Sequence, residues 1–394
     1  MVTYPGDWKK VSIDSLFDIY AGGDVKTEFY SAVRTAKYPF AIYSNGLENQ
    51  GLYGYTSMPI YPGNSVTVTA RGTIGYAFYR EKPFDAVIRL LVLVPKNGAV
   101  YPKFYEYVIN SQVVFEQENT GVPQLTVPKI GAKIVPYPSR REQEAIAETI
   151  AAFDTHISNL AALIEKKRAV RDAALEDLVS GRTRLAGFTE PWTESSLGSI
   201  GTFTKGAPLS KADISETGTP FILYGELYTT YSEVTYKVFR HTKKQAEAEH
   251  YSRIGDVIIP TSGETAEEIA TACCVMIPDV ILAGDLNIYR TSEMDGRFLS
   301  YVINHVVNRQ ISELAQGISI IHVNAKALGK IVVRYPSMKE QSAIVKIIDS
   351  MDEELLALEA EREKMTQIRE GVMDDLLTGR KRLNQSHERN ACAK

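Results

Sequence analysis

Two polar loops that contain glycine are the strongest candidates for chemistry in this sequence. Residues 69–75 read TARGTIG and follow a predicted strand, and residues 261–265 read TSGET and follow another predicted strand. Glycine lets a backbone approach a partner closely, and arginine and threonine can donate hydrogen bonds to phosphates or to base edges. The two loops therefore indicate contacts with a nucleic acid.

Other polar positions occur at matching places in the two halves of the chain. Residues 43–46 (YSNG) correspond to 224–227 (YGEL), and residues 119–124 (NTGVPQ) correspond to 316–320 (QGISI). Ordinary turn chemistry favours the same residue types, so only the shared positions favour a binding role. The candidate DNA contacts are Tyr43, Ser44, Asn45, Arg71, Thr73, Thr120, Gln124, Lys205, Tyr224, Thr261, Ser262, Thr265 and Ser319.

Motifs for catalysis are absent from the sequence. The six histidines are scattered without metal-ligand spacing, and no phosphate-cradling loop, dinucleotide fingerprint or serine nucleophile motif occurs. The Asp or Asn followed by Pro-Pro and an aromatic residue, with which amino-methyltransferases hold a flipped base, is also missing. We therefore predict no catalytic residue, no metal site, no bound cofactor and no small-molecule substrate for this chain.

The elements that must position the loops are duplicated. Trp8 and Trp192 open two copies of one apolar pattern, and residues 137–185 return 198 residues later at 335–383 with 20 of 49 positions identical and no gap. The offset between the copies drifts elsewhere, from 184 at the tryptophans (192 − 8) to 198 at the later match (335 − 137). The apolar patterns of the two copies match, while the loops between them differ in length and content. This predicts two related domains with dissimilar surfaces.

Each copy ends in a long predicted helix. Apolar residues recur at steps of four and three, which is the spacing of a narrow stripe that buries against a partner helix. Glu142 and Glu340 stand three residues after a serine and predict capping boxes, while Gly181 and Gly379 predict left-handed C-caps. The stripes, which we predict to pair the helices and to dock partner subunits, contain Ile146, Ile150, Phe153, Ile157, Leu160, Ile344, Ile348, Met351, Leu355 and Leu358.

The expected fold class is α+β. Two tandem α/β domains at residues 1–137 and 184–335 are separated by long helices at 138–183 and 336–380, followed by a disordered tail at 381–394. About 40 residues of helix span roughly 60 Å, so the two helices are expected to form an antiparallel coiled coil about a pseudo-twofold axis. The alternative is that each helix packs only on its own globular half.

Composition fits a globular protein. The chain has 394 residues, a hydrophobic content of 44% and a net charge of −4, which argues weakly against DNA binding because phosphate neutralisation needs Lys and Arg. Three cysteines without metal-ligand spacing imply no disulfide framework. We expect a cytoplasmic protein without a membrane segment, because no signal peptide or sufficiently long apolar run occurs.

Taken together, the chain resembles the specificity subunit of type I restriction-modification systems. The resemblance rests on the opening from Trp8 to Gly23, the entry into a long helix at residues 138–146, the exit LVSG at 178–181, and the repeat of all three from Trp192 to Gly379. It implies two target-recognition domains that each read one half of an asymmetric bipartite DNA site, with helices that set the gap. The apolar residues 317–321 depart from the polar loop usual in such proteins.

The resemblance also implies partners. Two methyltransferase subunits and two restriction subunits would carry S-adenosylmethionine, ATP and magnesium, and this chain would bind double-stranded DNA without catalysing a reaction. A duplicated coiled-coil scaffold that binds protein without DNA specificity is the alternative from another class, and a pseudo-dimeric hydrolase is a third. Turnover by this chain alone would be needed for the hydrolase.

Overall fold

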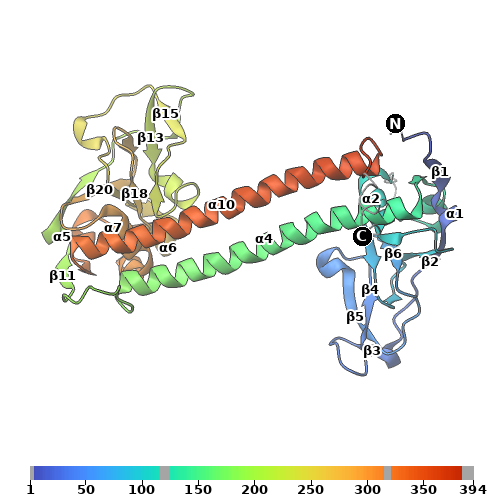
Figure 1. Ribbon diagram of the computed structural model, residues 1–394. Coiled ribbons are helices and arrows are strands. Elements are labelled where there is room, and N and C mark those ends of the chain that lie inside the picture. Colours follow the sequence, from blue (N-terminus) through green and yellow to red (C-terminus); the bar gives the residue numbers. More distant parts are fainter. Residues whose placement is uncertain (1–3, 116–123, 315–320, 384–394) are drawn as a thin grey trace, which may run out of the picture. The chain divides into compact units, whose positions relative to one another are not determined.

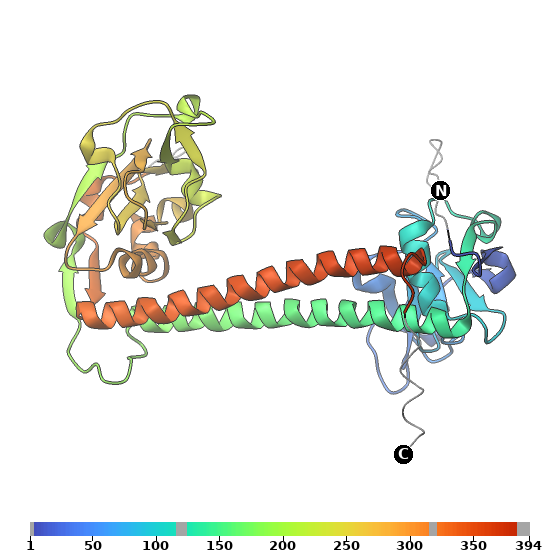
Figure 2. The same ribbon diagram turned by 45° about the horizontal axis from the view of Figure 1, so that its top comes forward.

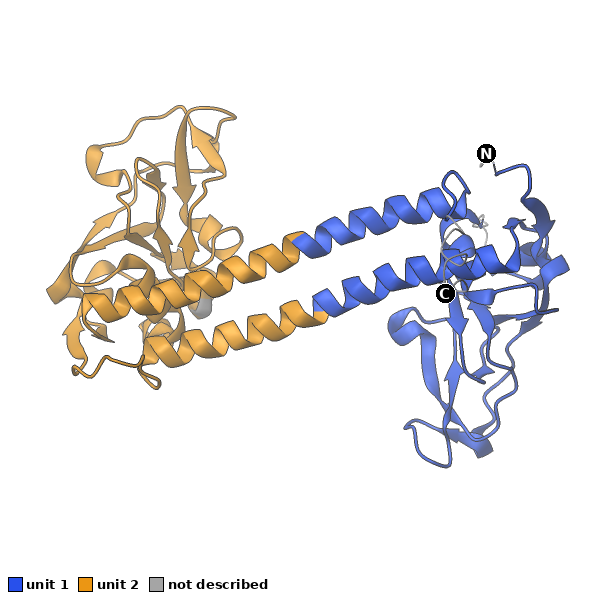
Figure 3. Cartoon of the chain, in the orientation of Figure 1, with its two compact units in different colours: residues 1–161, 361–394 blue, residues 162–360 orange. Residues whose placement is uncertain are grey.

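The computed structural model describes residues 4–115, 124–314 and 321–383, and divides the chain into two compact units. Unit 1 contains residues 1–161 and 361–394, and unit 2 contains residues 162–360 (Figure 3). Each long helix contributes its beginning to one unit and its end to the other. Among the described residues, no helix combines the length and the apolar character that crossing a membrane requires.

Unit 1 is built from two four-stranded sheets and a two-stranded ribbon (Figure 1). The first sheet has the order β2 (Phe17–Ala21), β9 (Leu91–Pro95), β6 (Ser65–Val68), β7 (Ala77–Arg80), and the second has the order β3 (Tyr30–Ser31), β5 (Leu52–Thr56), β4 (Phe40–Tyr43), β8 (Asp85–Ala86). β1 (Lys9–Ser12) pairs with β10 (Ile134–Tyr137). The α-helices are α1 (Ile13–Leu16), α2 (Pro102–Gln112) and α3 (Val127–Gly131), with the beginning of α4 (Arg140–Ser180) and the end of α10 (Met338–Leu377).

Unit 2 repeats the frame of the first sheet and of the ribbon. Its largest sheet has the order β12 (Gly201–Lys205), β20 (Leu286–Thr291), β16 (Asp256–Pro260), β18 (Cys273–Val275), β14 (Val234–Thr235), and a second has the order β15 (Arg240–Thr242), β13 (Thr219–Leu223), β19 (Ile281–Ala283). β11 (Thr193–Ser196) pairs with β22 (Val332–Tyr335), and β17 (Ser262–Gly263) with β21 (Ile321–His322). The α-helices are the end of α4, α5 (Leu197–Ile200), α6 (Ala266–Ile269), α7 (Gly296–His305), α8 (Asn308–Glu313), α9 (Ala325–Leu328) and the beginning of α10.

Two long helices, α4 and α10, form where the apolar stripes predict them. α4 ends at Ser180, directly before Gly181, where φ is +73°, and α10 ends at Leu377, two residues before Gly379, where φ is +71°. Glycine adopts this left-handed conformation without the penalty that a Cβ brings, so both glycines stop their helices as predicted.

In each unit the two helices are joined by ion pairs in antiparallel order. In unit 1, Arg369 Nε donates to Asp154 Oδ1 at 2.9 Å, and in unit 2, Arg171 Nε donates to Asp352 Oδ1 at 2.8 Å. These pairs are equivalent in the repeat, since both partners differ by 198 residues (369 − 171 and 352 − 154).

Both tryptophans pack at the end of the long helix that begins in the other copy. A Cβ placed on Gly379 would lie 3.4 Å from the Trp8 ring, and one on Gly181 would lie 3.2 Å from the Trp192 ring. Figure 2 shows the end of α10 beside the N-terminal segment of unit 1. Each unit is thus completed by the far end of a helix that starts in the other repeat.

The capping boxes predicted for the long helices are wrong in their second half. The Ser139 hydroxyl accepts a hydrogen bond from the Glu142 amide at 3.3 Å. The Glu142 carboxylate, however, accepts from Trp8 Nε1 at 3.1 Å and from Arg382 at 3.0 Å. Glu340 likewise binds Arg184 at 2.7 Å. These carboxylates hold charged partners from distant parts of the sequence instead of their own helix amides.

The prediction that the whole apolar stripe docks partner subunits is also wrong for its first members. Ile146 and Ile150 belong to the core of unit 1, and Ile344 and Ile348 belong to the core of unit 2; each is at most 2% exposed. Burial inside their own unit leaves these side chains no surface for a partner. Leu160 is buried as well, at 6% exposure, whereas Phe153, Ile157, Met351, Leu355 and Leu358 are partly exposed.

Candidate nucleic-acid interface

A strained two-residue tip stands where β8 leads into β9 in unit 1. Ile88 and Arg89 have φ angles of +56° and +63°, which are rare for residues with a Cβ and especially for a β-branched one. Backbone hydrogen bonds hold the tip: the amide of Ile88 donates to the Gly23 carbonyl at 2.9 Å, and the amide of Arg89 donates to the Gly22 carbonyl at 3.1 Å. Both side chains are exposed at this tip.

Asn45 connects this tip to the loop that the sequence singled out. Its Nδ2 donates to the Ile88 carbonyl at 2.5 Å, and its Oδ1 accepts from the Ala70 amide at 2.7 Å. The next residue, Arg71, forms a β-bridge with Gln124. The structure therefore brings together two predicted contacts, Arg71 and Gln124, while the half-buried Asn45 amide binds the backbone of both segments, and its contact with DNA stays a prediction.

We call the exposed side chains here the unit 1 edge, which contains Arg71, Thr73, Ile88, Arg89 and Gln124. Neither arginine makes an ion pair within the described part of the chain. An exposed guanidinium without a carboxylate partner keeps its donors available for phosphates or for the acceptors of guanine.

Unit 2 builds the same backbone frame with different residues. The amide of Gly206 donates to the Leu286 carbonyl at 2.9 Å, as in unit 1 the amide of Gly22 donates to the Leu90 carbonyl at 2.8 Å. The amide of Gly284 donates to the Ala207 carbonyl at 2.9 Å, and Gly284 has a φ of +82°. Gly284 therefore stands in the place of Ile88, and the following residue, Asp285, stands in the place of Arg89.

The second segment of the frame is equivalent too. The Val323 amide donates to the Thr261 carbonyl at 3.0 Å, as Leu125 does to Ala70 at 2.9 Å. The pairing of Ser262 with His322 then matches the bridge between Arg71 and Gln124. We call Asp285, His322 and Thr265, which are exposed, the unit 2 edge.

Ser262 is the clearest error among the predicted contacts of unit 2. It is only 4% exposed, its hydroxyl donates to Asp285 Oδ2 at 3.1 Å, and its carbonyl accepts from the Tyr228 hydroxyl at 2.6 Å. The residue positions Asp285 and offers no surface of its own. Thr265 is exposed, and its hydroxyl accepts from the Glu268 amide at 3.2 Å, close to the start of α6.

The other predicted contacts that the structure describes do not belong to the two edges. The Tyr43 ring lies under the guanidinium of Arg80 at 3.5 Å, and the half-buried Ser44 hydroxyl faces the Gly51 carbonyl at 3.5 Å. Tyr224 packs against a core cluster of unit 2, Thr261 is half-buried, and Lys205 is exposed next to Gly206. Thr120 and Ser319 lie outside the described residues.

Sequence reasoning missed Ile88, Arg89, Asp285 and His322. A usable signal was Gly284, because a glycine in one copy at the place of a non-glycine in the other marks a backbone position that prefers positive φ. Matching the leucines at 90 and 286 would have placed Arg89 against Asp285. That match lies in a segment where the offset between the copies drifts, which hides it in the sequence.

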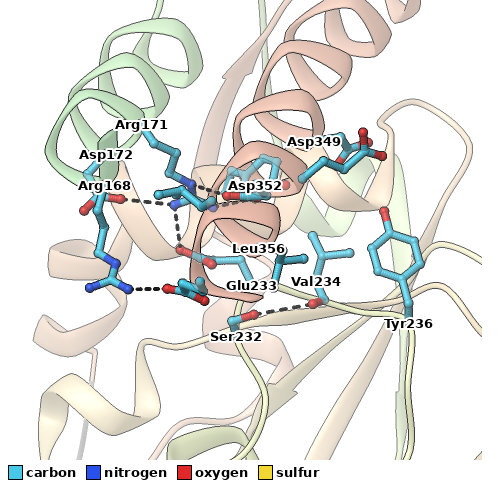
Figure 4. Close-up of a pocket in the computed structure, with 14 residues that line it drawn as sticks. Arg168, Arg171, Asp172, Ser232, Glu233, Val234, Tyr236, Asp349, Asp352 and Leu356 are labelled. Carbon is cyan, nitrogen blue, oxygen red and sulfur yellow. Dashed lines mark hydrogen bonds and ion pairs between the residues drawn. The ribbon is translucent and has the colours of Figure 1, made fainter. Parts of the chain in front are cut away.

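A cavity lies in unit 2 where α4, α10 and the loop before β14 meet. The cavity has a volume of about 860 Å³. Figure 4 shows Arg171 between Asp352 of α10 and Glu233 of the loop, at 2.8 Å and 3.7 Å respectively. Burial raises the pKa of Glu233, but the hydrogen bond from His305 and the charge of Arg171 outweigh it and lower this pKa to about 2. The ionised carboxylate thus ties the loop before β14 to α4 through Arg171 and to α7 through His305.

Among the described residues, one group of three could offer ligand atoms to a metal ion, namely Glu247, Glu249 and His250. The two glutamates are exposed, and His250 Nδ1 lies 3.0 Å from the Lys205 carbonyl. Exposed acidic groups of this kind are common without a metal, so we assign no metal site here.

Comparisons with known proteins bear on this arrangement. The family model for the type I restriction modification DNA specificity domain matches the chain twice, at residues 5–166 and 189–367. S.MgeORF438P of Mycoplasma genitalium, a proposed type I specificity subunit, is 28% identical over 232 residues, which are 56% of this chain and 58% of that protein. The specificity subunit of the type I restriction enzyme MjaIX from Methanocaldococcus jannaschii is 25% identical over 174 residues, 39% of this chain and 40% of that protein.

Two solved structures share the fold. The crystal structure of the type I restriction-modification S subunit from M. genitalium has a TM-score of 0.58 and 22% identity, and the comparison covers 94% of this chain and 96% of that one. The HsdS subunit from Thermoanaerobacter tengcongensis has a TM-score of 0.52 and 13% identity, with coverage of 95% and 98%. The chain matches these two curated relatives over less than two thirds of their own length, 58% for S.MgeORF438P and 40% for the MjaIX subunit.

Proposed function

Since the chain belongs to the type I restriction modification DNA specificity family, we propose that it selects the DNA sequence on which its complex acts. Each unit would read one half of an asymmetric bipartite site. The chain itself would be non-catalytic and would act in the cytoplasm.

The observation that carries this proposal is the pair of edges. The same backbone frame presents two arginines in unit 1, Arg71 and Arg89, and a carboxylate in unit 2, Asp285. Arginine donates to O6 and N7 of guanine, whereas a carboxylate accepts from the N4 amino group of cytosine. Two surfaces of opposite chemistry on one repeated frame suit a target whose halves differ.

The long helices would set the gap and dock the methyltransferase subunits. We infer that the antiparallel pairing seen in each unit continues as one coiled coil with a pseudo-twofold axis, supported by the equivalent ion pairs of Arg171 and Arg369. Partly exposed apolar residues on these helices are available for docking: Phe153, Ile157, Met351, Leu355 and Leu358. Leu356 is exposed by 65% and extends this set.

Partners would supply the chemistry. Two methyltransferase subunits would bind S-adenosylmethionine, and two restriction subunits would use ATP and magnesium. This chain would contribute double-stranded DNA recognition and would need no small-molecule substrate or cofactor of its own.

Genome-wide mapping of methylated bases tests the proposal. The chain is expressed with the methyltransferase subunit of its own system, and the methylated sites are aligned. We expect one bipartite sequence with unlike halves and a constant gap. Methylation without sequence preference would contradict the proposal and would favour the alternative, a duplicated scaffold that binds protein; the acidic residues around the unit 2 cavity, such as Asp349 and Glu353, favour that alternative.

A further inference from the structure

A second cavity, in unit 1, combines positive charge with aromatic walls. It has a volume of about 460 Å³ and lies between β4, β5 and the end of β7. Its cations are Arg34, Arg80 and Lys82, and its aromatic residues are Phe40, Tyr43, Tyr55 and Tyr79. One carboxylate, Glu81, lies among the lining residues. A cavity of this size is large enough for a ligand of the size of a nucleotide.

Arg80 makes this cavity unusual. It is only 3% exposed, yet it forms no ion pair among the described residues. Its Nε donates to the Thr67 hydroxyl at 2.9 Å and its Nη2 to the Gln50 carbonyl at 2.7 Å, while Nη1 has only the long contact of 3.5 Å to Gln50 Oε1. Burying a charge is costly, and burial lowers the pKa of Arg80 to about 10, although the charge of Glu106 opposes this shift.

The guanidinium is also fixed in orientation. Its central carbon lies 3.5 Å from the centre of the Tyr43 ring and 5.0 Å from that of Phe78. Arg34 and Lys82 are exposed at the same cavity and likewise make no ion pair within the described residues. The site is therefore one positioned arginine with two further cations at its rim, and a bound anion would supply the direct ion pair that Arg80 lacks among the described residues.

Unit 2 provides an internal contrast. Asn110 accepts from the Ala77 amide at 2.8 Å, and Asn304 accepts from the Ala272 amide at 3.1 Å, which aligns the two strands. Ala77 therefore corresponds to Ala272, and three residues further along each strand Val275 stands where unit 1 has Arg80. The repeated frame therefore does not need an arginine at this position, which favours a role in binding over a role in folding.

We propose that this cavity binds the phosphate group of a nucleotide, with the attached sugar or base against the aromatic wall. The phosphate could come from the DNA backbone or from a free nucleotide, and both share the chemistry that the three cations recognise. The DNA source rests on the proposed function, whereas the phosphate chemistry stands without it.

The test compares variants of the full chain with three probes: inorganic phosphate, dAMP and a fluorescein-labelled DNA duplex. The rim variant Arg34→Ala with Lys82→Ala removes two exposed cations, and Lys9→Ala with Lys10→Ala on β1 is the control with the same loss of charge. Calorimetry follows the small probes, and fluorescence anisotropy follows the duplex over a salt series. Arg80→Met removes the buried charge, and its thermal unfolding is recorded to show that it folds.

We expect the rim variant and Arg80→Met to lose binding of dAMP or of the duplex, while the control keeps the wild-type affinities. If the source is DNA, the log-log slope of duplex affinity against salt falls by about 2 in the rim variant, because two phosphate contacts are removed. If the source is a free nucleotide, dAMP binding falls and duplex binding is unchanged. If the rim variant and the control have the same affinities for all three probes, the proposal is overturned. This holds even if Arg80→Met fails to fold.

The outcome is separable from that of the proposed function. Methylation mapping with the rim variant reports on the half-sites independently of the probes. Pocket-dependent binding of dAMP together with methylation that lacks sequence preference would contradict the proposed function and support this inference. A bipartite methylation pattern together with a cavity that binds no probe would do the reverse.

Discussion

The edges of the two units show how one frame can carry two chemistries. In unit 1 the tip holds Ile88 and Arg89 at positive φ, where residues with a Cβ are strained, and Asn45 fastens it from the side. In unit 2 the same tip is Gly284 and Asp285, and the Ser262 hydroxyl holds the carboxylate. Unit 1 therefore accepts backbone strain to present a cation, whereas unit 2 presents an anion from a relaxed glycine turn.

The largest expected effect is on the first half-site. Changing Arg71→Ala together with Arg89→Ala should weaken recognition of one half-site by about 2–6 kcal/mol, since each bidentate contact to guanine contributes about 1–3 kcal/mol. The other half-site should be unchanged. Methylation kinetics on duplexes altered in one half at a time provide the measurement, with Asp285→Ala as the matched change in unit 2. Equal losses at both halves for either variant would contradict the assignment of the edges.

A smaller effect is expected on the free energy of unfolding in acid, and it comes from Glu233 of unit 2. The pKa of Glu233 is lowered from its usual 4.5 to about 2 in the folded chain. Its contribution to the free energy of unfolding is therefore complete above about pH 5. It is lost as the pH falls from about 4.5 towards 2, and amounts to at most about 3 kcal/mol. Denaturant unfolding across this range should show that Glu233→Gln loses this part of the pH dependence.

The control for that measurement is Glu353→Gln, an exposed carboxylate at the same cavity. It should retain the wild-type pH profile. A Glu233→Gln profile that parallels the wild type throughout would show that the carboxylate does not tie the loop to the helices.

The loss in free energy of unfolding should be about 1 kcal/mol larger for Trp8→Phe than for Trp192→Phe. Trp8 Nε1 donates to Glu142 at 3.1 Å, whereas Trp192 Nε1 is buried and has no hydrogen-bond partner in the described part of the chain. Trp8→Phe loses a hydrogen bond and leaves an acceptor behind, while Trp192→Phe removes an unsatisfied donor, so the first should destabilise more. Thermal unfolding of both variants checks this order. The reverse order would mean that the ring packing, not the hydrogen bond, dominates.

The smallest effect on affinity is expected from lengthening the long helices. Inserting a few residues near 165–168, with a matching insertion in α10, extends each helix by about 1.5 Å per residue. Mapped methylation sites should show a longer gap with both half-sites unchanged. Changed half-sites with an unchanged gap would show that the helices do not set the spacing.

The sequence predicted the frame well and the edges poorly, for physical reasons. The apolar stripes and terminal glycines are local signals, and they placed both long helices and their ends to within a few residues. Glu142 and Glu340 were misread because their partners, Arg382 and Arg184, lie 240 and 156 residues away. Arg89 and Asp285 are exposed by a turn that only the folded strands create, so no local pattern marked them.

The most direct test of the account exchanges the charges of the two tips. The single variants Arg89→Asp and Asp285→Arg are each expressed with the methyltransferase subunit, and methylated bases are mapped across a genome. The account predicts that Arg89→Asp changes one half-site only, that Asp285→Arg changes only the other, and that the gap stays constant. If both variants alter the same half-site, or neither alters any, the two edges do not read the two halves of the site.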